Sequence, residues 1–192
     1  MIERVEHINE NTDLAAAEKG TYQLLEGLGL DLTTESMAET PARMVRMYAE
    51  LLSPRPFNFT TFPNDENYDE LVLARGIPLT SVCEHHMLPF TGQAHVGYLP
   101  GKRILGLSKL ARVVEHFARR PQVQERLTKQ IADWLQKQLE PKGVGVVIQA
   151  EHSCMTLRGV QAVGSQTVTS TLLGCLRDNP GSRAEFLTLT HV

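Results

Sequence analysis

One short segment of the sequence concentrates side chains that bind metals and move protons. The segment "SVCEHHMLPF", residues 81–90, contains Cys83, His85 and His86. The C-x-x-H spacing of Cys83 and His86 lets a thiolate sulfur and an imidazole nitrogen converge on one ion from a single tight turn. A third candidate ligand, Cys154, follows in "EHSCM". Two thiolates and one imidazole would neutralise Zn²⁺ and leave its fourth tetrahedral position for water, which is the pattern of a catalytic zinc site.

Two other interpretations of these ligands stay open. His152 precedes Cys154 by two positions, and on an ideal strand both side chains would face the same side. His152 could then close the site as a structural Cys-His-Cys-His cluster. Unpaired cysteines are also commonly buried for packing alone. The third cysteine, Cys175, has no histidine close by and is predicted to be such a packing residue.

The additional histidines favour catalysis over a purely structural metal. His85 and His152 flank the proposed ligands, and imidazole is the side chain best suited to move protons near neutral pH. On an extended strand His85 would point away from His86, unless a turn or bulge bends the backbone. We therefore predict proton transfer close to an activated water.

A second group of residues has the character of an anion site. Ser108 is expected to cap a helix, and Lys109 and Arg112 follow on one face of its first turn. Free backbone N–H groups and the helix dipole favour an anion there. Arg158, four residues after Cys154, could join them. The alternative is an ordinary solvated helix face, where basic residues are common.

Gln124 and Glu125 begin the next predicted helix. A carboxylate at this position is explained equally well by the preference of acidic residues for helix N-termini. The functional interpretation is recognition of a base, because a carboxylate that accepts two parallel N–H bonds can bind a guanine-like edge.

Length and composition exclude several classes of protein. The chain has 192 residues, of which 42% are hydrophobic, enough for one domain with a helical appendage. Its formal net charge of −3 argues against a nucleic-acid-binding surface. No apolar run approaches the roughly 18 to 20 residues of a membrane span, and the N-terminal sequence has no signal-like apolar region. With three cysteines, an odd number, we expect a cytoplasmic protein with reduced thiols and no membrane partner.

Three regions follow one another along the chain. Residues 1–53 are predicted to be helical, and Thr40 and Pro41 mark the N-cap and first position of the second helix. Residues 54–69 are rich in Pro, Asn and Asp and predict a linker loop. Residues 70–192 contain all the candidate residues named so far and are expected to form the catalytic domain.

The catalytic region is predicted to be an α+β fold. Its β-like segments are 76–90, 92–99, 103–107, 143–157 and 164–174, and the turn "PGK" suggests that the second and third form a hairpin. Its predicted helices are 108–120, 121–140 and 182–189. In the second of these, an apolar stripe includes Leu127, Ile131 and Leu135. The order of hairpin, two helices, hairpin indicates an antiparallel sheet with two helices packed on one face.

Four ordered motifs resemble those of GTP cyclohydrolase I, a zinc enzyme that opens folate and pterin synthesis. They are "CEHHMLPFTGQAHVGYLP", "GLSKLARVVEHFARRPQVQERLTKQI", "EHSCMTLRGV" and "GSQTVTSTLLG", and "ETPARMVRMY" resembles the N-terminal helix motif of the family. The resemblance implies a tunnelling fold, in which antiparallel sheets of several subunits join into an oligomeric barrel. It also implies a homodecamer with active sites at subunit interfaces. The implied reaction converts GTP to 7,8-dihydroneopterin triphosphate and releases formate.

The same resemblance implies roles for individual residues. The implied zinc ligands are Cys83, His86 and Cys154. The implied catalytic residues are His85, His152 and Ser108. The implied substrate contacts are Glu125 with Gln124 for guanine, and Ser108, Lys109, Arg112 and Arg158 for the ribose and triphosphate. Arg46 stands where the family often carries lysine; the charge is the same, but the two side chains hold phosphate differently.

Two functions of other classes compete with this one. A related tunnelling-fold enzyme reduces a nitrile on a deazaguanine with a nucleophilic cysteine and a nicotinamide cofactor, without zinc. The set of Cys83, His86 and Cys154 and the basic cluster argue against it. A zinc-stapled binding module would have a closed metal site and no turnover, so release of formate from GTP distinguishes it from the enzyme.

Overall fold

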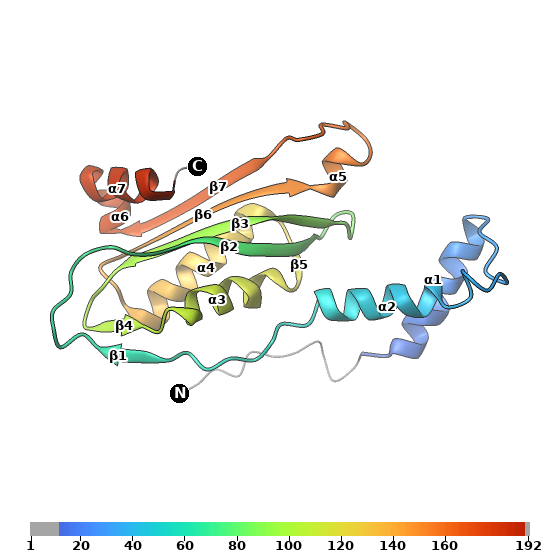
Figure 1. Ribbon diagram of the computed structural model, residues 1–192, viewed down its shortest axis with the longest axis horizontal. Coiled ribbons are helices and arrows are strands. Elements are labelled where there is room, and N and C mark those ends of the chain that lie inside the picture. Colours follow the sequence, from blue (N-terminus) through green and yellow to red (C-terminus); the bar gives the residue numbers. More distant parts are fainter. Residues whose placement is uncertain (1–11, 191–192) are drawn as a thin grey trace.

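A five-stranded sheet organises the computed structural model, which describes residues 12–190 (Figure 1). The strands lie in the order β5-β2-β3-β6-β7. Their bounds are β2 (Val72–Cys83), β3 (Pro89–Leu99), β5 (Pro121–Gln122), β6 (Gly143–His152) and β7 (Thr167–Gly174). All neighbours pair antiparallel except β2 and β5. The predicted α+β class with an antiparallel sheet is confirmed, and the elements follow the predicted order of hairpin, two helices, hairpin.

Two helices, α3 (Ser108–Ala118) and α4 (Gln124–Leu139), cover one face of the sheet, as predicted (Figure 1). Alternate strand residues point to this face because successive side chains on a strand alternate. The predicted apolar stripe of α4 packs against them in one continuous core, whose fully buried members include Val96, Ile148, Leu110, Leu127 and Ile131.

The opposite face carries a third helix, α7 (Pro180–Thr190), which follows the short helix α6 (Cys175–Asp178). Phe186 of α7 is fully buried over Gly97 and Gly145, which are register partners across β3 and β6. A Cβ atom added at Gly145 would come within 2.6 Å of the Phe186 ring. Glycine is therefore required at that position for the ring to pack this closely against the sheet.

The predicted hairpin between residues 92–99 and 103–107 is wrong. β4 (Arg103–Leu105) pairs instead with β1 (Thr61–Pro63), a strand inside the predicted linker 54–69. The Leu105 N–H donates to the Tyr98 hydroxyl at 2.8 Å, so β4 meets the end of β3 through a side chain rather than a ladder. The hairpin that does form joins β2 to β3.

Three predicted boundaries also differ from the structure. Leu107, not Ser108, is the N-cap of α3, and Ser108 makes no capping hydrogen bond. Pro121 does not start α4, because Pro121–Gln122 pairs with the end of β2 as β5. Cys154 does not lie on a strand: the chain leaves β6 at His152 and turns into the short helix α5 (Ser153–Thr156).

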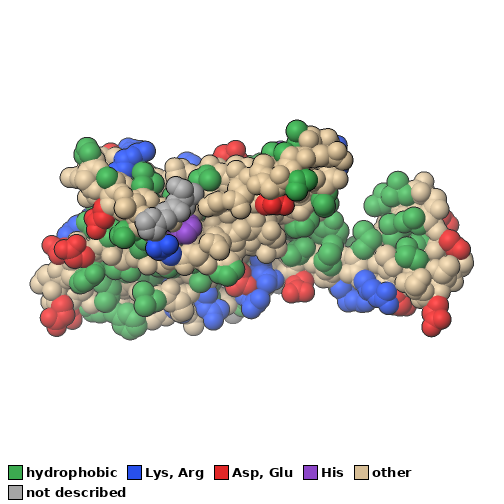
Figure 2. Space-filling model, turned by 45° about the horizontal axis from the view of Figure 1, so that its top comes forward, with side chains coloured by type: hydrophobic (Ala, Val, Ile, Leu, Met, Phe, Trp, Pro, Cys, Tyr) green, Lys and Arg blue, Asp and Glu red, His purple; other side chains and the backbone are tan. Residues whose placement is uncertain are grey.

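The N-terminal helices α1 (Leu14–Gly27) and α2 (Thr40–Leu51) form a pair that projects from one end of the sheet (Figures 1 and 2). α2 begins one residue earlier than predicted, since Glu39 is its N-cap and Thr40 is already helical. The pair leaves many apolar side chains on its surface: Leu14, Tyr22, Leu24, Leu28, Leu30 and Met47. Among residues 12–190, no helix has both the length and the apolar character needed to cross a bilayer.

Candidate active site

Three potential metal ligands meet where the β2–β3 hairpin turns. Cys83 ends β2, and the Nδ1 atom of His86 lies 3.6 Å from its Sγ atom. Cys154 arrives from α5, and the ligand atoms of all three residues lie within 4.8 Å of one another. The structure thus brings together the three residues that the sequence predicted as ligands.

A tight turn gives the two local ligands their geometry. The Cys83 N–H donates to the Leu88 carbonyl, and the Met87 N–H donates to the Cys83 carbonyl, each at 2.8 Å. Met87 adopts a φ of 53°, in the left-handed region, which closes the turn. The Tyr48 hydroxyl of α2 donates to the Met87 carbonyl at 3.0 Å, so the N-terminal helices are tied to this turn. This turn is the bend that the sequence analysis required if His85 was not to point away from His86.

The three donors fit a zinc ion. Tetrahedral Zn²⁺ bonds of about 2.0–2.3 Å hold neighbouring ligand atoms roughly 3.5 Å apart, close to the spacing of Cys83 and His86. Burial raises the pKa of the Cys154 thiol, and the nearby Cys83 sulfur raises that pKa further. Two thiolates this close repel each other unless a cation lies between them, and a soft dication is the partner that such donors select.

His152 lies beside these ligands but is not one of the clustered donors. Its ring stacks on Phe90 with a centroid separation of 4.5 Å and an interplanar angle of 10°. Its Nε2 atom lies 2.8 Å from Oε1 of Gln124. Because the backbone turns into α5 directly after His152, His152 and Cys154 do not share one face of a strand, which was the basis for a closed four-ligand cluster.

Gln124 and Glu125 open α4 beside His152. The Gln124 side chain is buried and bonded within the chain, whereas the Glu125 side chain is exposed. Burial lowers the pKa of His152, and the negative charge of Glu125 partly offsets that shift. Glu125 therefore presents a free carboxylate to solvent at the edge of the site. Gln124, expected to contact guanine, has its amide engaged in the protein interior.

The predicted phosphate contacts are divided between the metal turn and the far end of α3. The positive charge of Arg158 lowers the pKa of Cys154, so Arg158 lies on the metal side. Ser108 and Lys109 lie at the start of α3, whose 11 residues span roughly 16 Å. The other end of α3 is the one near the metal turn, since the Ser81 hydroxyl on β2 donates to the Ala118 carbonyl at 2.7 Å.

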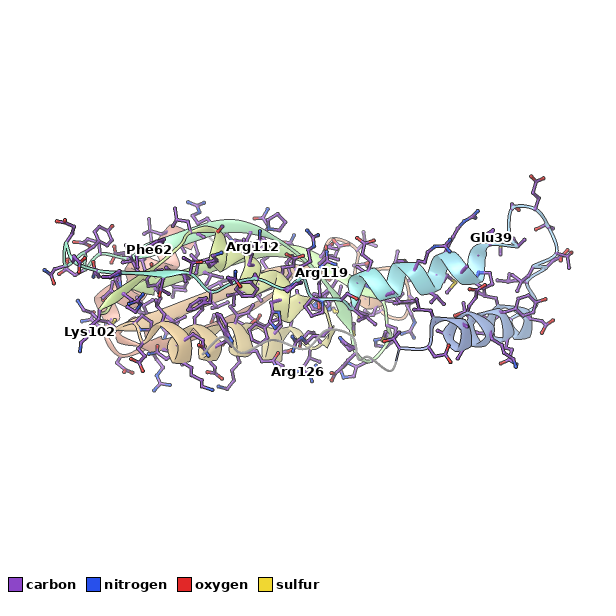
Figure 3. The ribbon with its side chains drawn as sticks, turned by 90° about the horizontal axis from the view of Figure 1, so that it is seen from below. Glu39, Phe62, Lys102, Arg112, Arg119 and Arg126 are labelled. Carbon is purple, nitrogen blue, oxygen red and sulfur yellow. The ribbon has the colours of Figure 1, made fainter. Side chains whose placement is uncertain are left out.

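The remaining basic residues of the predicted anion site are exposed. Arg112 projects from α3 toward solvent, as Figure 3 shows. Arg46 is exposed on α2. Within one chain, Ser108 and Lys109 lie at the end of α3 farther from the metal turn.

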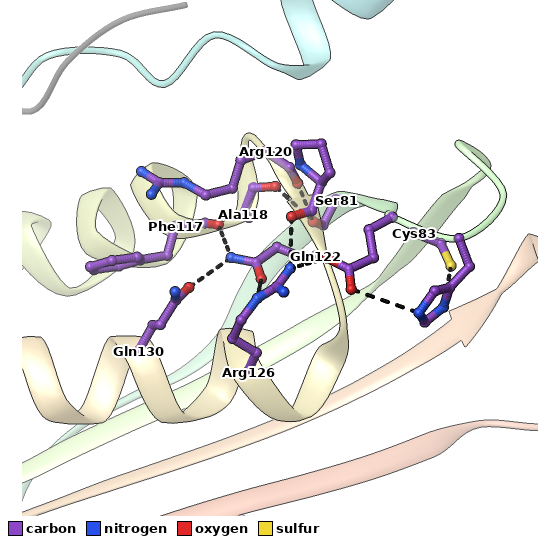
Figure 4. Close-up of polar contacts among 11 residues, drawn as sticks. Ser81, Cys83, Phe117, Ala118, Arg120, Gln122, Arg126 and Gln130 are labelled. Atoms are coloured by element: carbon purple, nitrogen blue, oxygen red, sulfur yellow. Dashed lines mark hydrogen bonds and ion pairs between the residues drawn. The ribbon is translucent and has the colours of Figure 1, made fainter.

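Sequence reasoning missed a polar network behind the metal turn. Arg126 of α4 donates to the Glu84 carboxylate and, at 3.0 Å each, to the Pro121 carbonyl and the Gln122 Oε1 atom. Figure 4 shows Arg126 and the buried Gln122 beside Cys83. Glu84 and Arg126 are 42 positions apart, and nothing in their local spacing indicates a contact. Phe90 was missed too, because an apolar residue after a turn is typical of any core strand.

Comparison with known proteins agrees with this geometry. The family model described as GTP cyclohydrolase I matches residues 17–191. The GTP cyclohydrolase 1 of Hydrogenobaculum sp. (strain Y04AAS1) is 50% identical over 171 residues, covering 89% of this chain and 94% of the relative. That of Aquifex aeolicus (strain VF5) is 53% identical over 165 residues, covering 86% and 90%. That of Thermobifida fusca (strain YX) is 50% identical over 182 residues, covering 92% and 88%.

A solved structure titled as the archaeosine synthase QueF-Like in the apo form aligns with 54% of this chain and 93% of its own, at 18% identity and a TM-score of 0.43. The family match and the three relatives extend over nearly the whole chain and over nearly the whole length of each relative. The chain belongs to the GTP cyclohydrolase I family.

Proposed function

We propose that the chain converts GTP to 7,8-dihydroneopterin triphosphate with release of formate, as a zinc-dependent enzyme. The observation that carries the proposal is the cluster of Cys83, His86 and Cys154 beside two histidines that are not among its donors. A purely structural zinc site uses four protein ligands, whereas three leave a position for chemistry. Family membership supports the same reaction.

Cys83, His86 and Cys154 are the residues that would hold Zn²⁺. When bound, the ion supplies a Lewis acid that activates water and polarises substrate groups for hydrolysis. The chain's own side chains do the proton transfers. His85 is accessible, with 61% of its side chain exposed, and its Nε2 atom lies 3.7 Å from the Glu84 carboxylate.

Recognition of guanine is assigned to Glu125. Its exposed carboxylate, at the start of α4 and close to His152, can accept the N1–H and the exocyclic N2–H of guanine as two parallel bonds. Adenine offers no such pair of donors. Arg158, on the same side as the metal ligands, is positioned to contact the substrate's phosphates.

We propose that each complete active site is shared between copies of the chain. Ser108 and Lys109 start α3, whose other end is the one near the metal ligands of the same chain, and Arg112 lies in the middle of the helix, so these residues would serve the site of a neighbour. Two features support an assembly: β7 is an edge strand with one unpaired side, and α1 and α2 expose apolar side chains. The proposed assembly is a homodecamer in the cytoplasm, where the three free thiols stay reduced.

Formate release measured with three nucleotides tests this proposal. Zinc-loaded protein is incubated with GTP, ATP or guanosine, and formate and the fluorescence of the oxidised pterin are measured. GTP should be turned over. ATP should react at least about a hundredfold more slowly, because adenine would leave the Glu125 carboxylate without its donors. Guanosine should be poor for another reason, since it lacks the phosphates that position the base.

The outcomes separate the parts of the proposal. Equal rates with ATP and GTP would overturn the assignment of Glu125 to guanine. Zinc-loaded protein that releases no formate from any of the three would favour the binding module over the enzyme. A Glu125→Gln variant should lose most activity toward GTP while keeping its zinc, since Glu125 is not among the clustered donors.

A further inference from the structure

Both polar atoms of the Gln124 side-chain amide have hydrogen-bond partners within the chain. Only 2% of the residue is exposed. The Nε2 atom is 3.0 Å from the Ile148 carbonyl oxygen, 2.9 Å from the Thr167 carbonyl oxygen and 3.1 Å from the Thr169 hydroxyl. Backbone carbonyls only accept hydrogen bonds, so the atom between two of them must be the NH₂ group. This fixes the amide orientation without reference to any substrate.

The orientation of the amide dictates the state of one nitrogen of His152. With its NH₂ group directed at β6 and β7, Gln124 presents Oε1 to the Nε2 atom of His152 at 2.8 Å. An amide oxygen only accepts, so Nε2 of His152 must carry a proton and donate it. This holds for the neutral ring and for the charged ring alike. Nδ1 has no hydrogen-bond partner within residues 12–190.

Two threonines reinforce the arrangement. The Thr128 hydroxyl lies 2.7 Å from the Gln124 main-chain carbonyl and therefore donates to it. The Thr169 hydroxyl, 2.6 Å from the Thr128 oxygen, can then donate to Thr128 and accept from the Gln124 NH₂ group. Phe90 stacks on the imidazole ring at 4.5 Å and 10° and holds its plane. Gln124 and Phe90 together leave the His152 ring no free rotation.

We infer that Gln124 is a positioning residue, which keeps a proton on Nε2 of His152 and makes Nδ1 the only nitrogen that exchanges protons with the substrate. In the step this permits, Nδ1 takes a proton from bound substrate, the ring becomes an imidazolium, and Nδ1 returns the proton to substrate or water. Gln124 Oε1 accepts from the Nε2–H throughout and stabilises the imidazolium. Gln124 thus acts through His152 and does not bind guanine with its side chain.

Spectroscopy of the free enzyme tests the first part without any turnover. The full-length, zinc-loaded chain is labelled with ¹⁵N-histidine, and the His152 signals are identified by their loss in a His152→Asn variant. We expect a protonated Nε2 in the wild type. In Gln124→Met, which has similar length but no acceptor, the two neutral tautomers should both appear. A wild-type His152 with a bare Nε2 would overturn the inference, whether or not the protein hydrolyses GTP.

Kinetics test the second part, which rests on the proposed GTP reaction. Gln124→Met should lower kcat about 10- to 100-fold, the usual effect of removing a group that orients an imidazole, with KM for GTP changed less than about threefold. If Gln124 held guanine instead, KM would rise and kcat would change little.

The matched control is Gln130→Met on the same helix. Gln130 accepts from Gln122 at 2.9 Å and has no bond to His152, so kcat and the His152 spectrum should stay at wild-type values. Equal losses in both variants would mean that loss of an amide side chain from α4, rather than an effect on His152, lowers kcat, and would overturn the inference. If Gln124→Met does not fold, the wild-type spectrum alone still decides the protonation of Nε2.

Discussion

Arg126 and Glu84 join the start of α4 to the turn that carries the metal ligands. The Glu84 N–H also donates to the Gln122 carbonyl at 3.0 Å, so main-chain and side-chain bonds act between the same two segments. The hydrogen bond from Arg126 lowers the pKa of Glu84, which keeps the carboxylate ionised. This contact sets how far the metal ligands lie from Glu125, the neighbour of Arg126.

Breaking this ion pair should loosen the metal site. Arg126→Met and Glu84→Gln are each expected to weaken zinc retention by up to about fivefold, measured by competition with a chromogenic chelator, because a partly exposed pair contributes little. The double variant should lose no more than either single variant, since both remove the same interaction. Lys129→Met is the control: it breaks the 2.6 Å pair with Asp133 on the same helix, away from the turn. Additive losses would show that the two residues act separately.

Removal of one thiolate should abolish metal binding but leave the fold intact. Cys154→Ser is expected to lose zinc and formate release, while circular dichroism stays native because the main core packs around α3 and α4. Chelation of the wild type should lower its unfolding midpoint, since a ligand present at 100 times its Kd stabilises by about 2.7 kcal/mol. A Cys154→Ser protein with full zinc content would exclude Cys154 as a ligand.

A shared active site predicts which inactive variants rescue each other. Lys109→Ala changes the start of α3, and His85→Ala changes the metal turn near the other end of that helix. Hybrids of the two variants should therefore contain sites that combine an intact metal turn from one chain with an intact Lys109 from another. For random mixing by co-expression, roughly a quarter of the sites would be intact, with activity to match. Glu125→Ala with His85→Ala is the control pair and should stay inactive, because both changes lie on the metal side of one chain. Rescue by the control pair, or none by the first, would contradict the shared arrangement.

His116 should make the protein less stable in acid. The residue is only 3% exposed, and burial followed by the adjacent Arg120 lowers the pKa of His116 to about 4. An unfolded histidine has a pKa of about 6.5. Between pH 4 and pH 6.5, the unfolded chain therefore binds a proton at position 116 that the folded chain does not bind. The free energy of unfolding should therefore fall by up to about 3 kcal/mol as the pH drops from 6.5 through 4.

The control variant for this prediction is His116→Gln. The glutamine amide oxygen can still accept the hydrogen bond that Arg120 donates to His116 at 3.0 Å. Urea unfolding at pH 7.5 and pH 4.5 should show a smaller difference in this variant than in the wild type, because the other histidines contribute equally to both. Identical pH dependence in the two proteins would show that His116 is not the group responsible.

The local parts of the site could be predicted from the sequence. Cys83 and His86 are three positions apart, so one turn decides their geometry, and the stripe of Leu127 and Ile131 follows the helical period regardless of what it packs against. The α+β class was predictable for the same reason, since strand and helix patterns alternate clearly.

Contacts between distant segments could not be predicted. β1 and β4 have three residues each, too few to show a period, so their pairing left no pattern in the sequence. The alternation of β6 continues into "SCM", which concealed the turn into α5 at Ser153. The buried Gln124 amide is bonded to Ile148 on β6 and Thr167 on β7, which are 24 and 43 positions away in the sequence. A glutamine beside a glutamate gives no sign of these contacts.

The packing of Phe186 on Gly97 and Gly145 depends on the register between β3 and β6. Both glycines are synthesised before Phe186, so the sheet can pair before α7 has left the ribosome. A slip of one residue between β3 and β6 would exchange the faces of the sheet and put side chains where the ring must lie. A slip of two residues in one direction would place Val147 opposite Gly97, where its side chain would take space that the Phe186 ring needs. The packing of α7 therefore favours the observed pairing of β3 and β6 over these slips, and this helix is synthesised after both strands.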